Sequence, residues 1–266
     1  MGVSATLSAA AVTVLGTAAA FEKCRLTRAF AADRAEGRLA APGNEAPPPR
    51  PARPERPVLL APREMPKRAY GGEKGRIGLI HALAHIELNA IDLAWDMVCR
   101  FSAEAMPGAF LDDWVRVALD EAIHFEMLAG LLHRLGAAYG DLPAHDGLWQ
   151  AAEKTADDLM ARLVVVPMTL EARGLDTTPT TIERLTRNGD DLTPPALEVI
   201  YRDEIRHVAA GLRWFRFLAE RRGLDGKAEY HRLMADRFPG GLKPPFNHDA
   251  RAEAGFPRDW YEPLGR

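Results

Sequence analysis

The sequence carries one pattern of metal-binding residue types twice. Each copy has a glutamate, then an aspartate–glutamate pair, then a histidine three positions after the second glutamate. The first glutamate and the aspartate are separated by 32 residues in one copy and by 31 in the other. Residues i and i+3 lie on one face of an α-helix, so the second glutamate and the histidine can reach the same cation. The two copies are Glu87 with Asp120, Glu121 and His124, and Glu171 with Asp203, Glu204 and His207.

The pattern predicts a dinuclear metal site with six ligands. Four glutamates and two histidines are the ligand set of di-iron and di-manganese carboxylate proteins. Hard carboxylate oxygens and neutral imidazoles suit Fe(II) and Mn(II), so we expect two iron ions, with manganese or a mixed Mn/Fe pair as alternatives. The glutamates stand in apolar surroundings, such as VALDEAIHF around Glu121. A buried carboxylate is costly without a cation or partner, which favours a metal site over a solvated helix face.

The elements that would position these residues are helices. Apolar residues recur at helical spacing in four long segments, and no segment alternates as a strand would. Gly174 predicts the end of the third segment, and Thr193 is expected to cap the start of the fourth. The four segments are Lys74–Phe101, Asp112–Leu135, Gly147–Arg173 and Ala196–Arg222. We therefore expect an all-α protein whose body spans residues 73–222.

Two extensions flank this body. Residues 1–40 are Ala-rich and predict a helical extension of one or two helices, and residues 41–72 form a Pro-rich connector. Met1–Phe21 is apolar like a signal peptide, but Lys23 and Arg25 follow the apolar stretch instead of preceding it. We interpret the stretch as an amphipathic helix, with an apolar face that runs from Leu7 to Phe21. Residues 223–266 predict an irregular tail that wraps over the body.

Composition restricts the function classes. The 266 residues have a net charge of −3 and an isoelectric point near 6.3, without the basic field that general nucleic-acid binding requires. The two cysteines, Cys24 and Cys99, cannot build a disulfide scaffold, which favours a reducing, cytoplasmic compartment. Apart from the N-terminal segment, no apolar run is long enough to span a membrane, so we expect no membrane association.

The doubled motif resembles that of the ferritin-like superfamily. Its second half, with Arg206 inside Asp203–His207, is similar to the DExRH box of di-iron oxygenases, desaturases and ribonucleotide-reductase small subunits; the first half has Ile123 instead of arginine. HALAHIELNAIDL, MTLEARGLD and LKPPFNHDARAEAGF resemble an uncharacterised bacterial ferritin-like family of unknown function. The resemblance implies a ferritin-like four-helix bundle with a dinuclear site, an N-terminal helical extension and an irregular C-terminal tail.

Further residues are candidates for supporting roles. A metal-binding histidine commonly donates its other N–H to a carboxylate. Asp120 and Asp203 could supply one, and the resemblance implies that Asp203 faces His124 and Asp120 faces His207. Arg206 either braces one of these aspartates or faces solvent.

Three other residues near the motif have two interpretations each. Tyr201 shares a helix face with Glu204; a redox role is conceivable by analogy, but core packing with a satisfied hydroxyl is favoured. His81 and His85 lie one turn apart like a metal-binding pair, and we interpret them as hydrogen-bonded structural histidines.

The leading functional hypothesis is an O₂-activating oxidase or monooxygenase that acts on a small organic substrate. An electron-donor protein and a second copy of the chain, forming a homodimer, are partners that this hypothesis allows. A manganese catalase or peroxidase, and an iron-binding ferroxidase or storage protein, are the alternatives. Uncharged side chains one turn from the ligands are expected to line an apolar pocket, with tail aromatics as a lid. The lining residues are Leu83, Ala84, Ala90, Ile91, Val117, Phe125, Pro167, Met168 and Val208, and the lid residues are Phe246, Phe256, Trp260 and Tyr261.

Overall fold

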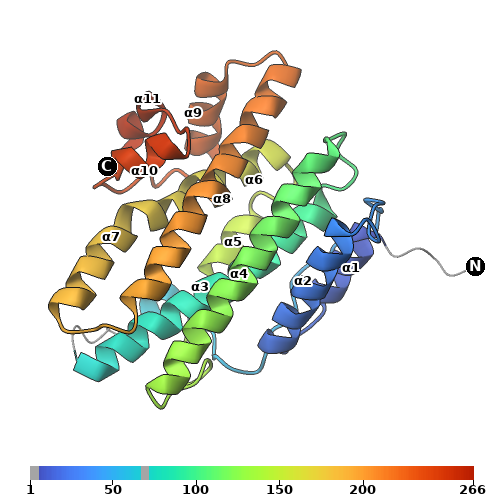
Figure 1. Cartoon of the computed structure of the whole chain (residues 1–266). Helices are drawn as coiled ribbons and strands as arrows, with labels where there is room; N and C mark the ends of the chain where they lie inside the picture. The colour runs from blue at the N-terminus through green and yellow to red at the C-terminus, as the bar shows by residue number, and fades with distance from the viewer. Residues whose placement is uncertain (1–5, 67–71) are drawn as a thin grey trace, which may run out of the picture. The chain divides into compact units, whose positions relative to one another are not determined.

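The computed structural model describes residues 6–66 and 72–266, and its regular elements are helices (Figure 1). Within the described residues no strand forms; two isolated bridges join Leu59 to Ala144 and Leu242 to Gly265. The prediction of an all-α protein is therefore confirmed. The first five residues of the predicted N-terminal extension, and residues 67–71 of the predicted connector, lie outside the described part of the chain. The chain divides into two compact units, Met1–Gly147 and Leu148–Arg266.

The first unit is built around two long helices, α3 (Gly72–Arg100) and α4 (Gly108–Arg134), which pack along each other (Figure 1). Two shorter helices cover them: α1 (Leu7–Leu15) packs on α3, and α2 (Ala20–Ala35) packs on α4. The side-chain oxygen of Thr6 accepts a hydrogen bond from the Ala9 amide and caps α1, as expected of a threonine at this position.

Two helices form in the described part of the N-terminal extension, as the prediction of one or two allows, but the predicted continuous apolar face from Leu7 to Phe21 is wrong. α1 ends at Leu15, and α2 begins only at Ala20. Leu7, Ala11 and Val14 are fully buried, whereas the Phe21 side chain, beyond the break, is 60% exposed. The break at Gly16 rotates α2 onto a different neighbour, so the helical periodicity does not continue across it.

The Pro-rich connector carries no helix from residue 40 to 61 and is followed by a short 3₁₀ turn, η1 (Pro62–Glu64). Its backbone is tied to the first unit, because the Ala52 amide donates to the Leu15 carbonyl. Lys23, which is buried, forms an ion pair with Asp92 on α3 and also donates to the Ala52 carbonyl, at 3.4 Å. The connector is thus part of the packed unit.

The predicted continuous helix Gly147–Arg173 does not form. This stretch is broken into α5 (Gly147–Glu153), α6 (Leu159–Val165) and a π-helical turn, η2 (Val166–Glu171), after which α7 runs from Ala172 to Arg187. Asp158 caps α6 by accepting from the Met160 amide. Gly174 does not end the helix: it lies inside α7, and a Cβ there would be 4.0 Å from the Glu204 Cγ. That distance is an ordinary van der Waals contact, so the packing of α7 on α8 does not require a glycine here.

α8 (Pro194–Arg221) lies beside α7 and η2 in this unit (Figure 1). Its bounds agree with the predicted segment to within two residues, but Thr193 does not cap it through its side chain. The Thr193 hydroxyl instead donates to the Asp190 carboxylate, at 2.7 Å, and the same carboxylate accepts from the Thr193 amide. Asp190 therefore organises the turn into α8.

The C-terminal tail is more regular than expected. It contains α9 (Gly226–Arg237), α10 (His248–Glu253), α11 (Arg258–Tyr261) and a final 3₁₀ turn, η3 (Glu262–Leu264). Asp225 and Asn247 cap α9 and α10 by accepting from backbone amides, which explains why helices start there. Within the second unit α10 contacts α7 and α8; that the tail wraps over the whole body stays a prediction.

A buried arginine fastens this tail. The Arg251 guanidinium donates to both carboxylate oxygens of Asp176 on α7, at 2.9 and 2.7 Å. It also lies over the rings of Phe246 and Phe256 and 4.5 Å from the ring centroid of Tyr261. Since both charges are buried, each depends on the other.

By length and composition alone, one helix of the described residues, α3, could cross a membrane. In the structure, 67% of the most apolar 18-residue stretch of α3 is buried within the protein, as in a core helix.

Candidate metal centre

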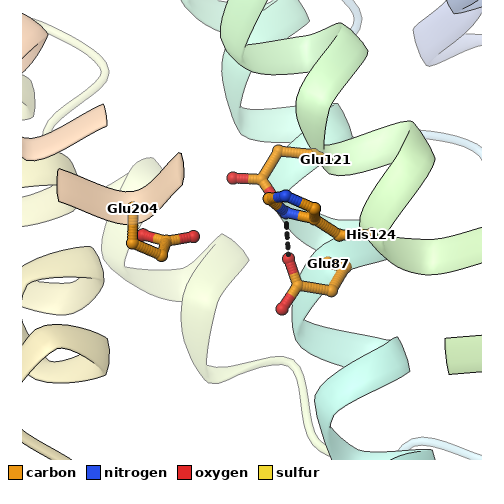
Figure 2. Close-up of side chains that lie close together, drawn as sticks. All are labelled: Glu87, Glu121, His124 and Glu204. Atoms are coloured by element: carbon orange, nitrogen blue, oxygen red, sulfur yellow. Dashed lines mark hydrogen bonds and ion pairs between the residues drawn. The ribbon is translucent and has the colours of Figure 1, made fainter. Parts of the chain in front are cut away.

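The first copy of the motif forms a cluster of three side chains in the first unit. Glu87 comes from α3, and Glu121 and His124 come from α4 (Figure 2). The His124 Nδ1 lies 3.4 Å from a Glu87 carboxylate oxygen and 3.2 Å from a Glu121 oxygen. One potential ligand atom from each of the three lies within 4.8 Å of the others. The packing of α3 on α4 therefore brings Glu87 to the Glu121–His124 pair.

The three side chains of this cluster are buried, and their charges act on one another. Glu87 is 4% exposed, and Glu121 and His124 are fully buried. Burial, and next the negative charge of Glu121, raise the pKa of Glu87 well above its ordinary value; the hydrogen bond with His124 opposes this in part. Two buried carboxylates side by side need a proton or a cation between them.

The second copy forms a matching cluster in the second unit. Glu171 is the last residue of η2, and Glu204 and His207 lie on α8. One potential ligand atom from each lies within 4.8 Å of the others, and the His207 Nδ1 is 3.6 Å from a Glu204 oxygen. Glu204 and His207 are buried, and Glu171 is half-buried. In both clusters one glutamate and the histidine lie three residues apart on one helix, and the second glutamate comes from another element.

The π-helical turn that carries Glu171 has a local cause. Pro167 lies inside η2 and has no amide hydrogen to donate to the preceding turn. The Thr169 hydroxyl donates to the Val164 carbonyl at 2.8 Å, within the irregular turn. Such turns are frequent at functional sites. The only sequence signal of this turn is Pro167, which lies four residues before the predicted ligand Glu171.

The two aspartates of the motif are bound by arginines of their own helices. Arg116 donates to Asp120 at 3.0 Å, and Arg206 donates to Asp203 at 2.7 Å. Both aspartates are buried, while the Arg206 side chain is 51% exposed. Arg206 therefore braces Asp203 and faces solvent at the same time, which combines the two alternatives. The expected pairings of Asp203 with His124 and of Asp120 with His207 stay predictions.

The hydroxyl of Tyr201 is satisfied, as the favoured interpretation requires. It accepts a hydrogen bond at 2.8 Å from the Asn247 side-chain amide, which also donates to the Leu175 carbonyl. A redox role for Tyr201 stays untested. Asn247 was missed, because the expectation that the tail wraps over the body does not say which tail residue reaches α8.

His81 and His85 are structural, as predicted. The His81 Nε2 accepts from the Gly140 amide at 3.0 Å. The His85 Nδ1 is 2.9 Å from the Tyr139 hydroxyl, and its Nε2 is 3.1 Å from the His145 carbonyl oxygen. The Asn89 side-chain amide nitrogen also lies 3.1 Å from this Nε2, so both ring nitrogens of His85 have polar partners.

A pocket of about 280 Å³ lies in the first unit, and two of its lining rings, Phe21 and Tyr139, pack edge-on against Phe125. Its walls are four alanines, two aromatic rings, one proline and two basic side chains, and none of them belongs to the predicted lining. These residues are Ala20, Phe21, Pro54, Arg56, Ala129, His133, Ala137, Ala138 and Tyr139. The predicted pocket beside the metals stays a prediction.

Comparison with known proteins assigns the chain to a family. The family described as protein of unknown function (DUF455) matches residues 16–262. The chain belongs to this family. Both clusters of the DUF455 chain lie inside the matched range. An uncharacterized protein of Haemophilus influenzae is 42% identical to it over 215 residues, which cover 78% of this chain and 75% of that protein. No solved structure matches the chain.

Proposed function

We propose that this DUF455 protein is a dinuclear iron protein of the ferritin-like type. Its four-helix bundle would combine α3 and α4 with the η2–α7 segment and α8, and its two clusters would hold one pair of metal ions. The observation that carries the proposal is that each compact unit brings two glutamates and one histidine together, with ligand atoms within 4.8 Å of one another. The six ligands would be Glu87, Glu121, His124, Glu171, Glu204 and His207.

The donor chemistry fits this assignment. Carboxylate oxygens and imidazole nitrogens favour Fe(II) or Mn(II), and neither cluster contains a thiolate that would select copper or an iron–sulfur cluster. Two divalent ions carry four positive charges, which would balance the four glutamates. Near neutrality is what a buried site requires, since uncompensated charges are costly inside a protein.

Bound iron would supply the activation of O₂ for the oxidation of a small organic substrate. The protein would contribute geometry and exclusion of water. Asp203, held by Arg206, and Asp120, held by Arg116, are fixed directly before the ligands Glu204 and Glu121. The fully buried side chains of Ala84, Ile91 and Phe125, within about one turn of the ligands of the first cluster along α3 and α4, would exclude water there.

Iron loading tests this proposal. Protein purified without added metal should contain iron, and anaerobic addition of Fe(II) followed by air should stop at about two irons per chain. Oxygen uptake should follow reduction of the loaded protein. Uptake of tens of irons per chain would indicate storage, and rapid disproportionation of hydrogen peroxide by manganese-loaded protein would indicate a catalase. Absence of tight metal binding would overturn the proposal.

A further inference from the structure

Four arginines form a line along the exposed face of α8. With about 100° of rotation per residue, Arg206, Arg213 and Arg216 lie within about 40° of Arg202 around the helix axis. The side chains of Arg202 and Arg206 are 68% and 51% exposed, and Arg213 and Arg216 are exposed as well. The line extends over about 21 Å. We call these four residues the arginine stripe.

The arginine stripe lies on the back of a helix that carries candidate metal ligands. Glu204 and His207 are about 160° and 140° from Arg202 around the axis of α8, and both are buried. The stripe and these ligands are therefore separated by little more than the thickness of one helix, about 10 Å.

Several guanidinium groups of the stripe are held in place by neighbouring groups. Arg206 is paired with Asp203, and Arg216 donates to the Gly255 carbonyl at 3.2 Å while lying over the Trp260 ring. Arg213 lies over the Trp214 ring, 5.7 Å from its centroid. Arginine and aromatic side chains are the residue types that contribute most to protein–protein interfaces. Ordered side chains also lose less entropy on binding.

The surrounding charges favour a compact partner over an extended polyanion. Two exposed acids on the same line, Glu198 and Glu220, bound the stripe at its two ends. The whole chain is acidic, with a net charge of −3, so a long nucleic acid would meet repulsion beyond the stripe. A small acidic protein can instead place its negative patch on the four arginines alone.

We propose that the arginine stripe is the docking surface for an acidic one-electron carrier protein that reduces the metal centre. This inference rests on the proposed function, because an O₂-activating iron site must be returned to Fe(II). In each encounter the reduced carrier loses one electron and one Fe(III) becomes Fe(II), so two encounters reduce both irons. The electron needs to cross only α8.

Calorimetric binding of a plant-type [2Fe–2S] ferredoxin, and of flavodoxin as a second acidic carrier, tests the docking surface. The full-length protein is used with and without iron. At about 20 mM ionic strength at least one carrier should bind, and affinity should fall by about tenfold or more at 200 mM, because exposed charges are screened. The double variant R202E/R213E should lose about tenfold in affinity at low salt. Arg206 is left intact because it braces Asp203.

The matched control is R134E/R187E, which makes the same charge change at exposed arginines in the last turns of α4 and α7. It should stay within about twofold of the wild type. Equal losses in both double variants, salt-independent binding, or failure of both carriers to bind would overturn the docking surface. Loss of affinity for an RNA oligonucleotide in R202E/R213E, with carrier binding unchanged, would assign the stripe to nucleic acid instead.

The two proposals fail separately. Docking is measured on iron-free protein as well, so a chain that binds the carrier but holds no iron contradicts only the metal assignment. A chain that loads about two irons but binds neither carrier contradicts only the docking surface. In the iron-loaded protein, stopped-flow oxidation of the reduced carrier should slow in R202E/R213E and not in R134E/R187E.

Discussion

Gly211 on α8 faces Pro167 of η2 so closely that a Cβ at position 211 would lie 2.5 Å from the Cβ and the Cγ of the proline ring. No ordinary side chain fits this space without movement of the backbone. Because η2 ends at Glu171, and Glu204 and His207 lie on α8, the contact determines how near the third candidate ligand comes to the other two.

Gly211→Ala should therefore displace η2. We expect a loss of about 1–3 kcal/mol in the free energy of unfolding, the usual cost of overpacking, and weaker metal binding. Gly130→Ala is the control, since its Cβ would meet nothing within 4 Å on α4 and should stabilise that helix by up to about 1 kcal/mol. Urea unfolding and metal analysis measure both effects. A Gly211→Ala protein with unchanged stability and metal content would contradict the proposed role of this contact.

Glu121→Ala should separate a ligand role from a structural one. The variant should lose at least one of about two metals per chain. The metal-free protein should keep or gain stability, because a buried carboxylate beside Glu87 is removed. Glu126→Ala, on the same helix but in an ion pair with Arg28 at the surface, should change neither quantity by much. Elemental analysis and thermal unfolding of the metal-free proteins decide between these outcomes, and unchanged metal content in Glu121→Ala would exclude it as a ligand.

Removal of metal should destabilise the wild-type protein. Ions that bind only the folded state raise its stability in proportion to the logarithm of their concentration, and here they would also neutralise buried glutamates. The melting temperature should fall after treatment with a chelator and recover when Fe(II) or Mn(II) is returned. Equal melting temperatures with and without chelator would show that the clusters hold no metal under these conditions.

Acid should weaken the first unit through His85. Burial, with a contribution from the positive charge of Arg53, lowers the pKa of His85 from 6.5 to about 4. Between pH 6.5 and about 4, the unfolded chain therefore binds a proton at His85 and the folded chain does not. This contribution to stability is complete above pH 6.5 and declines as the pH falls toward 4. Between pH 7 and pH 5 it amounts to about 2 kcal/mol. Urea unfolding at pH 7 and at pH 5 measures the loss of stability between the two pH values. This loss should be smaller in His85→Gln than in the wild type.

Arg251→Ala should loosen the tail. Asp176 would be left buried without its bidentate partner, at a cost of about 3–5 kcal/mol in the free energy of unfolding. Arg258→Ala removes an exposed ion pair with Glu262 from the same tail and should cost less than about 1 kcal/mol. Limited proteolysis should cut the tail of Arg251→Ala faster than that of Arg258→Ala. Similar cleavage rates would show that the aromatic rings alone hold the tail.

The match to a family of unknown function and the all-α class agree with what the residues predict. The approach of a glutamate to a histidine three residues later on α4 and on α8 was also predicted. Glu121 with His124, and Glu204 with His207, are neighbours because residues three apart on an α-helix always share a face. The same local reasoning identified His81 and His85 as structural, although their partners Gly140, Tyr139 and His145 could not be named in advance.

Local periodicity failed where a neighbour determined the conformation. Gly174 has the residue type of a helix stop, yet it lies inside α7, which packs on α8 and continues to Arg187. The proline in VVVPMTLE made a π-helical turn within a longer helical segment, whose end at Arg187 the pattern did not predict. The tail is attached to α7 at Arg251 because Asp176, some 75 residues earlier, supplies the opposite charge.

The sequence by itself determined which residue types stand on which helix face, because the 3.6-residue period is a property of the backbone. Only the tertiary structure decided that Glu87 reaches the Glu121–His124 pair and that Glu171 reaches Glu204 and His207. Those approaches depend on the register of one helix against another. Register is set by the packing of many small contacts, such as Gly211 on Pro167, that no local pattern encodes.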